Sequence, residues 1–60
     1  MRLNLDTNKL YSIDEVANYF SVSAQTVKAW IKQGKLKAFK AGRSYRLTAN
    51  ALQYFVDSNN

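Results

Sequence analysis

Two helix-start signals follow each other closely in this sequence, and they limit what the first half of the chain can form. Ser12 and Glu15 have the spacing of a capping box, in which the serine hydroxyl accepts a first-turn amide and the glutamate reaches back. Ser23 is a second good N-cap. The first helix must therefore end near Phe20, and the second begins after only two or three residues.

Apolar residues recur at helical spacing behind both caps. In the first helix the apolar face consists of Ile13, Val16, Ala17 and Phe20. In the second helix it consists of Val27, Trp30 and Ile31. Gly34 suits the C′ position, where a left-handed backbone ends a helix without a Cβ penalty. The pattern predicts two short amphipathic helices joined by a tight turn.

The rest of the chain predicts a hairpin and a third helix. The stretch 36–47 holds two short runs with aromatic content around a turn at Gly42. Thr48 then caps a helix that runs from Ala49 to about Asp57. Because an isolated hairpin is marginal in water, we expect it to rest on the helices.

The order helix, helix, hairpin, helix indicates an α+β fold, mainly α: a winged helix-turn-helix whose wing is a two-stranded hairpin. We expect this domain to span 10–57, after an N-terminal tail at 1–9 and before a C-terminal tail at 58–60. A short strand is expected near Leu10 and Tyr11. The expected core is apolar throughout: Ile13, Val16, Ala17, Phe20, Val27, Trp30, Ile31, Leu36, Phe39, Leu47, Leu52 and Phe55.

Composition excludes several classes of function. The 60 residues include no cysteine and no histidine, which removes the usual zinc sites and the cysteine and histidine nucleophiles. Asp14 and Glu15 are adjacent on a helix, so their side chains diverge, and the two glycines do not form a phosphate-binding loop. We expect no enzyme activity, no metal and no cofactor. No signal peptide or membrane-spanning run is present, so we expect a cytoplasmic protein.

Positive charge is confined to one part of the chain. Between Ala24 and Leu47 there are seven cations and no acid: Lys28, Lys32, Lys35, Lys37, Lys40, Arg43 and Arg46. The remainder holds two cations and four acids, within an overall net charge of +5. This separation indicates a face that binds a polyanion, and the alternative is a solvated basic surface.

The second helix is the stronger candidate for reading a nucleic acid. A helix fits the major groove of DNA, and helix-turn-helix proteins place the N-terminal part of their second helix nearest the bases. This puts Gln25 and Lys28 deepest, with Thr26 to one side and Lys32 near a phosphate. The residues of this helix expected to contact DNA are Ala24, Gln25, Thr26, Lys28, Ala29 and Lys32.

The hairpin is the second candidate. Arg43 at its tip is placed to enter a minor groove, where negative potential attracts arginine. Lys40 and Arg46 on the arms are expected to meet phosphates, and Ser44 is included in this set. Two alternatives stay open: Arg46 is structural and pairs with Glu15 or Asp14, and Tyr45 is a core or capping residue rather than a stacking platform.

The residues from Tyr11 to Phe55 resemble the excisionase-type winged helix-turn-helix proteins, relatives of the MerR DNA-binding head. Six short sequence segments carry the resemblance, in the same order as in the family and with family-like spacing: 12–17, 22–23, 26–27, 34–36, 38–40 and 42–47. It departs at Ala24 and Ala29, where family members often carry arginine. Because of these departures, we expect Gln25, Lys28 and Lys32 to make the main contacts of this helix.

What the resemblance implies is a sequence-specific binder of double-stranded DNA. The leading hypothesis is an excisionase, or recombination directionality factor, that bends DNA to assist an integrase in a bacterial or phage-host nucleoid. The alternatives are a small phage- or plasmid-type transcriptional regulator and a protein-interaction module that uses the basic face. MerR regulators dimerise through a long helix after this domain, and this chain ends at Asn60. We therefore expect any self-association to occur on DNA.

Overall fold

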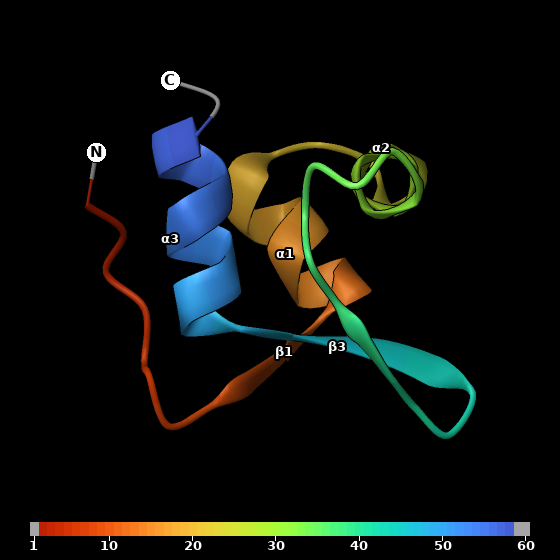
Figure 1. Cartoon of the computed structure of the whole chain (residues 1–60), viewed down its shortest axis with the longest axis horizontal. Coiled ribbons are helices and arrows are strands. Elements are labelled where there is room, and N and C mark those ends of the chain that lie inside the picture. Colours follow the sequence, from red (N-terminus) through yellow and green to blue (C-terminus); the bar gives the residue numbers. More distant parts are fainter. Residues whose placement is uncertain (1, 59–60) are drawn as a thin grey trace.

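Three helices and a three-stranded antiparallel sheet form the fold (Figure 1). The structure is a computed structural model, and it describes residues 2–58. The elements in chain order are β1 (Leu10–Ser12), α1 (Ile13–Phe20), α2 (Ala24–Lys32), β2 (Phe39–Ala41), β3 (Ser44–Thr48) and α3 (Ala49–Ser58). The predicted class, a mainly helical α+β winged helix-turn-helix, is confirmed.

Both predicted N-caps are formed. The Ser12 hydroxyl accepts a hydrogen bond from the Glu15 amide at 3.1 Å, and the Ser12 amide donates to Glu15 Oε1 at 3.0 Å. At the start of α2, Ser23 Oγ accepts from the Thr26 amide at 3.1 Å. These bonds satisfy first-turn amides that have no partner within the helix. The two helix starts are thus fixed locally by the sequence.

The turn between α1 and α2 is a left-handed cap. Ser21 has φ 59° and ψ 44°. The Val22 amide donates to the Ala17 carbonyl at 2.9 Å, and the Ser21 amide donates to the Asn18 carbonyl at 3.2 Å. This is the Schellman pattern, which satisfies the last carbonyls of α1 and turns the chain sharply into α2.

The end of α2 follows the same pattern around the predicted glycine. Gly34 has φ +79°. The Lys35 amide donates to the Trp30 carbonyl at 3.0 Å, and the Gly34 amide donates to the Ile31 carbonyl at 3.1 Å. The expected C′ glycine is therefore confirmed, and it directs the chain away from α2 toward the wing.

The sheet has the strand order β1-β3-β2. The predicted hairpin is β2 with β3, and β1 adds a third strand on the other side of β3. In this register Arg46 lies between Ser12 on β1 and Phe39 on β2. Since β1 runs directly into α1, this pairing joins the start of α1 to the wing.

The core includes most of the expected residues, with one correction. Val16, Val27, Leu36, Leu47 and Leu52 are almost completely buried, at 0–1% exposure. Phe39, expected in the core, is 46% exposed. The reason is the alternation of side chains along a strand. Phe39 pairs with Arg46, next to the inward Leu47 on β3, so it lies on the outer face of the sheet.

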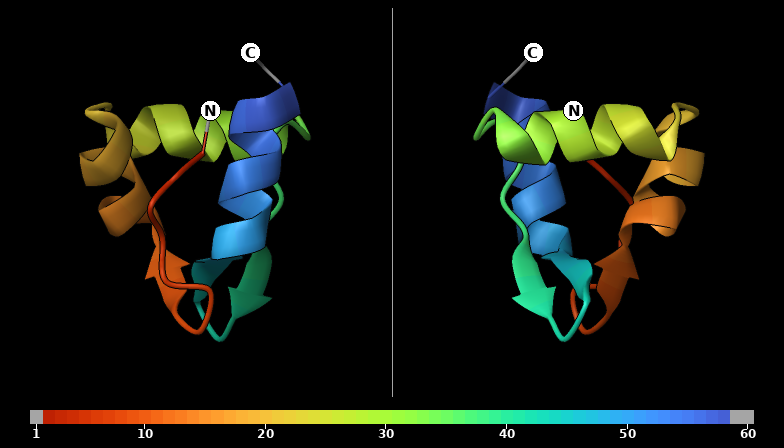
Figure 2. Two further views of the ribbon diagram at one scale, coloured as in Figure 1. Left: turned by 90° about the vertical axis from the view of Figure 1, so that its left-hand side faces the viewer. Right: turned by 90° about the vertical axis from the view of Figure 1, so that its right-hand side faces the viewer.

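Part of the segment 2–9, which was expected to form a tail, packs against the rest of the domain. Leu3 is buried, and its amide donates to Gln53 Oε1 of α3 at 2.7 Å. The Asp6 amide donates to the Tyr11 hydroxyl at 3.0 Å. Figure 2 shows this segment crossing between α1 and α3, on the opposite side of the molecule from α2. Of the expected C-terminal tail, Ser58 belongs to α3, and 59–60 lie outside the described residues.

Candidate nucleic-acid interface

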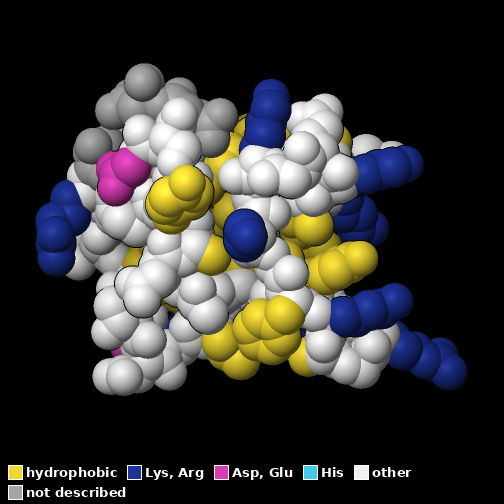
Figure 3. Space-filling view, in the orientation of Figure 1, with side chains coloured by type: hydrophobic (Ala, Val, Ile, Leu, Met, Phe, Trp, Pro, Cys, Tyr) yellow, Lys and Arg dark blue, Asp and Glu magenta, His cyan; other side chains and the backbone are white. Residues whose placement is uncertain are grey.

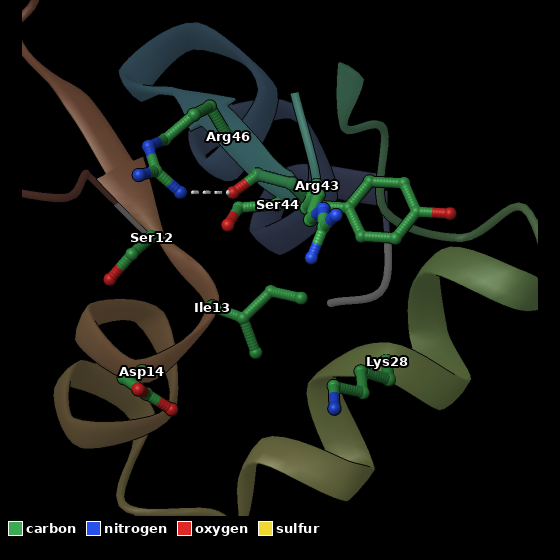
Figure 4. Close-up of a pocket in the computed structure, with 8 residues that line it drawn as sticks. Ser12, Ile13, Asp14, Lys28, Arg43, Ser44 and Arg46 are labelled. Atoms are coloured by element: carbon green, nitrogen blue, oxygen red, sulfur yellow. Dashed lines mark hydrogen bonds between the residues drawn. The ribbon is translucent and has the colours of Figure 1, made fainter. Parts of the chain in front are cut away.

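An open groove of about 620 Å³ separates α2 from the wing (Figure 4). Its walls come from three parts of the fold: β1 with the start of α1, the middle of α2, and the tip of the wing with the strand that follows. The lining residues are Ser12, Ile13, Asp14, Lys28, Arg43, Ser44, Tyr45 and Arg46. Three of these are cations, so the groove is suited to an anionic chain.

On α2, the residues predicted to reach deepest are on the solvent side. Gln25, Lys28 and Lys32 are all exposed, and their spacing places them along one face of the helix. Ala24 and Ala29 are half-buried at the edge of this face. The exposed face of α2 thus combines one amide and two ammonium groups.

Thr26 has a structural contact beside its predicted role. Its hydroxyl lies 3.0 Å from Ser23 Oγ, and its amide donates to the same oxygen. The Thr26 side chain is half-buried against the N-cap. Its hydroxyl therefore takes part in holding the start of α2, which positions Gln25 and Lys28.

The wing has a two-residue turn. Ala41 pairs with Ser44, so Gly42 and Arg43 form the loop. Gly42 has φ +66° and Arg43 has no positive φ, which is the pattern of a type II′ hairpin turn with glycine first. This turn places the exposed Arg43 at the tip, with the exposed side chains of Lys40 and Ser44 on the two arms.

Arg46 is held by the wing itself. Its Nη1 donates to the Tyr45 carbonyl at 2.9 Å, the bond drawn in Figure 4. Within the described residues it forms no ion pair with Glu15 or Asp14, the pairing that the structural alternative named. Tyr45 is 38% exposed and lines the groove, so the alternative that placed it in the core is wrong.

Glu15 is instead paired with Lys9. Lys9 Nζ lies 2.7 Å from Glu15 Oε2. This contact lowers the pKa of Glu15 below its ordinary value, through the hydrogen bond with Lys9 first and the backbone bond from Ser12 second. The same hydrogen bond raises the pKa of Lys9. Neither residue lines the groove, so this pair leaves the charge of the groove unchanged.

Cations of α2 and the wing lie along one side of the molecule. Figure 3 shows Lys and Arg side chains projecting along the edge formed by α2 and the wing. Of the seven cations predicted to form the basic half, Lys28, Arg43 and Arg46 converge on the groove. Lys32 and Lys40 are exposed outside it. The fold thus collects charges from separate elements onto one surface.

The sequence did not indicate the contribution of β1 and α1 to this groove. Ser12, Ile13 and Asp14 line it because β1 pairs with β3 and carries the first turn of α1 to the wing. A short strand was expected beside Leu10, but its partner was not. The sequence did offer one indirect indication of this contribution. The expected strand leads directly into the cap of the first helix, and the expected hairpin has an edge with which such a strand can pair.

The fold and this groove define a winged helix-turn-helix domain of the DNA-binding type. The chain belongs to the helix-turn-helix domain family, whose model matches residues 10–60. This family supports sequence-specific DNA binding, with DNA as the partner. Comparison with curated proteins and with solved structures gave no match.

The described residues contain neither a cluster of metal-ligating side chains nor a membrane-spanning helix. Within 2–58, no group of three or more potential metal-ligating side chains comes together. No helix in the same range has the length and apolar character needed to cross a membrane.

Proposed function

We propose that this protein recognises a specific site on double-stranded DNA and acts as an accessory factor of the excisionase type, binding and bending DNA to assist an integrase. One observation carries the proposal: Lys28 of α2 and Arg43 and Arg46 of the wing line a single groove. A DNA strand that runs along this groove meets cations on both walls. The helix on one side and the hairpin on the other then lie against adjacent grooves of the duplex.

In this proposal α2 enters the major groove. The groove is about 12 Å wide, which admits one helix. Gln25 pairs with adenine N6 and N7, and Lys28 donates to guanine O6 and N7, because these are the groups that those side chains match. Lys32, one turn further from the N-terminus, meets a phosphate. Ala24, Thr26 and Ala29 complete the contact surface.

The wing supplies affinity. Arg43 at the tip of the type II′ turn enters the neighbouring minor groove, and Lys40, Ser44 and Arg46 contact the backbone. Since phosphate contacts carry no direct sequence information, the wing contributes similarly on all duplexes. Sequence choice then depends mainly on Gln25 and Lys28.

The size of the domain favours action in arrays. Its extents are 30 × 24 × 19 Å, and one helical turn of DNA is about 34–36 Å long. One copy therefore covers no more than about one turn. To bend a longer segment, several copies must bind side by side, which is the self-association on DNA that the sequence led us to expect. An integrase is the proposed protein partner.

Footprinting across the DNA that flanks the gene tests this role. We expect a phased array of protected sites beside a recombination site. A single site over a promoter contradicts the excisionase role and supports a small transcriptional regulator instead. Lys28→Ala should remove the protection, whereas Arg2→Gln, which removes a charge outside the groove, should preserve it. Equal effects of both variants contradict the proposed interface.

A further inference from the structure

Asp14 is the one carboxylate among the residues that line the groove. It lies in the first turn of α1, and its side chain is exposed. Figure 4 shows it on the wall opposite Lys28, with Ile13 between them and Arg43 on the wing above. Asp14 therefore faces the same space as the cations that are proposed to hold DNA.

The carboxylate of Asp14 is not neutralised by the rest of the described chain. Within residues 2–58 it forms no ion pair and accepts no side-chain hydrogen bond. Its neighbour Glu15 differs, because it closes the capping box and pairs with Lys9. The Glu15 carboxylate is therefore used in the capping box and the ion pair. The Asp14 carboxylate has no such partner, so its charge can act on a ligand in the groove.

The position of Asp14 in the groove is fixed by the sheet. Ser12 pairs with Arg46 across β1 and β3, and the same residue caps α1. Asp14 follows two residues later, in the first turn, where the helix dipole favours a negative charge. The fold therefore holds an anion at the α1 wall, while Lys28 and Arg43 hold cations at the other two walls.

We propose that Asp14 is a specificity-determining residue, which keeps DNA phosphates away from the α1 wall and so weakens binding to DNA of unrelated sequence. The inference rests on the proposed DNA-binding function. On unrelated DNA the protein is held by charge alone and takes many registers, some of which bring a phosphate to Asp14. On the specific site, base contacts from α2 fix one register, with the phosphates beside Lys32 and the wing and away from Asp14.

The size of the effect follows from simple electrostatics. Two like charges about 4 Å apart in water repel enough to change a binding constant by about fivefold. We therefore expect Asp14→Asn to tighten binding to a scrambled duplex by up to about fivefold at low salt, because only some registers place a phosphate beside Asp14. On the specific site the change should be below about twofold, because that register keeps phosphates away from the α1 wall.

Asp6→Asn provides a matched control. It makes the same change in net charge, and Asp6 is exposed outside the groove. Its carboxylate accepts a hydrogen bond from the Asn8 amide at 2.9 Å, which an asparagine oxygen can also accept. The probes are a short duplex recovered by selection from a randomised pool and a duplex of the same composition with scrambled sequence. Both variants are checked first for cooperative thermal unfolding.

We expect Asp14→Asn to tighten binding to the scrambled duplex only. For Asp6→Asn, the binding constants on both duplexes should change by less than about twofold. Equal shifts for the two variants overturn it, since net charge alone then explains the result. Equal tightening of both duplexes by Asp14→Asn also overturns it, because Asp14 then lowers affinity without affecting specificity. If the folded wild-type protein binds neither duplex, the proposed function itself fails, and this inference fails with it.

Discussion

The rings of Trp30 and Phe55 lie 4.8 Å apart between centroids, tilted by 36°. Phe20 contacts both rings edge-on, at 6.0 Å from Trp30 and 6.1 Å from Phe55. One aromatic cluster therefore joins α1, α2 and α3, and it supports α2 from behind its exposed face. Together with the fully buried Val27 of α2, this cluster holds α2 against the core.

Trp30→Ala should abolish the fold at room temperature. Truncating a large aromatic residue costs about 3–5 kcal/mol, which is comparable to the whole stability expected of so small a domain. Thermal unfolding followed by circular dichroism measures this loss. Tyr54→Ala is the control, because Tyr54 is 66% exposed and should change the midpoint little. A cooperative transition above room temperature in the Trp30 variant contradicts the prediction.

Ser21→Gly should stabilise the protein. Ser21 holds a positive φ in the turn between α1 and α2, a conformation that costs a side-chain-bearing residue free energy that glycine avoids. We expect a gain of up to about 1 kcal/mol in the free energy of unfolding, measured by urea denaturation. Gly34→Ala places a Cβ at φ +79° and should have the opposite sign. A loss of stability for Ser21→Gly would show that its hydroxyl matters more than its backbone.

Glu15→Gln should change how stability depends on pH. The pKa of Glu15 is lowered in the folded protein, so its charge stabilises the fold above the ordinary value of 4.5, and this contribution is lost as the pH falls through the folded pKa. Glutamine can still accept the Ser12 amide but carries no charge. The difference in melting temperature between wild type and variant should therefore shrink as the pH drops below 4.5. A constant difference across that range contradicts the Lys9 pairing as its cause.

Gln25→Ala and Arg43→Ala should separate sequence choice from affinity. Loss of Gln25 should relax preference at one base pair by about 1–3 kcal/mol, because a bidentate contact to adenine is removed. Loss of Arg43 should weaken binding to specific and random duplexes alike, because it removes a charge at the wing tip. Binding constants on both duplexes measure the difference. If both variants lose the same affinity on the specific and the random duplex, Gln25 does not determine sequence choice and the prediction is wrong.

Much of the fold could be predicted because its determinants are local. Capping by Ser12 and Ser23, the glycine that ends α2 and the turn at Gly42 each depend on a few neighbouring residues, and each is present in the structure. Phe39 was misplaced because a short strand does not reveal by itself which of its faces is inward. Its pairing with Arg46 decides that, and the pairing depends on distant residues.

Long-range contacts also account for what was missed in the core and at the site. Leu3 is buried through contact with α3, fifty residues along the chain, and nothing in the polar segment around it indicates this. The place of Asp14 in the groove likewise depends on the pairing of β1 with β3. The cations of α2 and the wing were predictable as a set because their charge stands out in the sequence itself.

The salt dependence of duplex binding tests the central claim most directly, namely that α2 and the wing together bind the DNA backbone. With roughly 4–6 phosphate contacts, the logarithm of the binding constant should fall against the logarithm of salt concentration with a slope of about −4 to −5. Lys32→Ala, which removes the proposed phosphate contact of α2, should reduce the slope by about 1. A protein that is folded, as shown by circular dichroism, and binds no duplex at low salt would contradict the account.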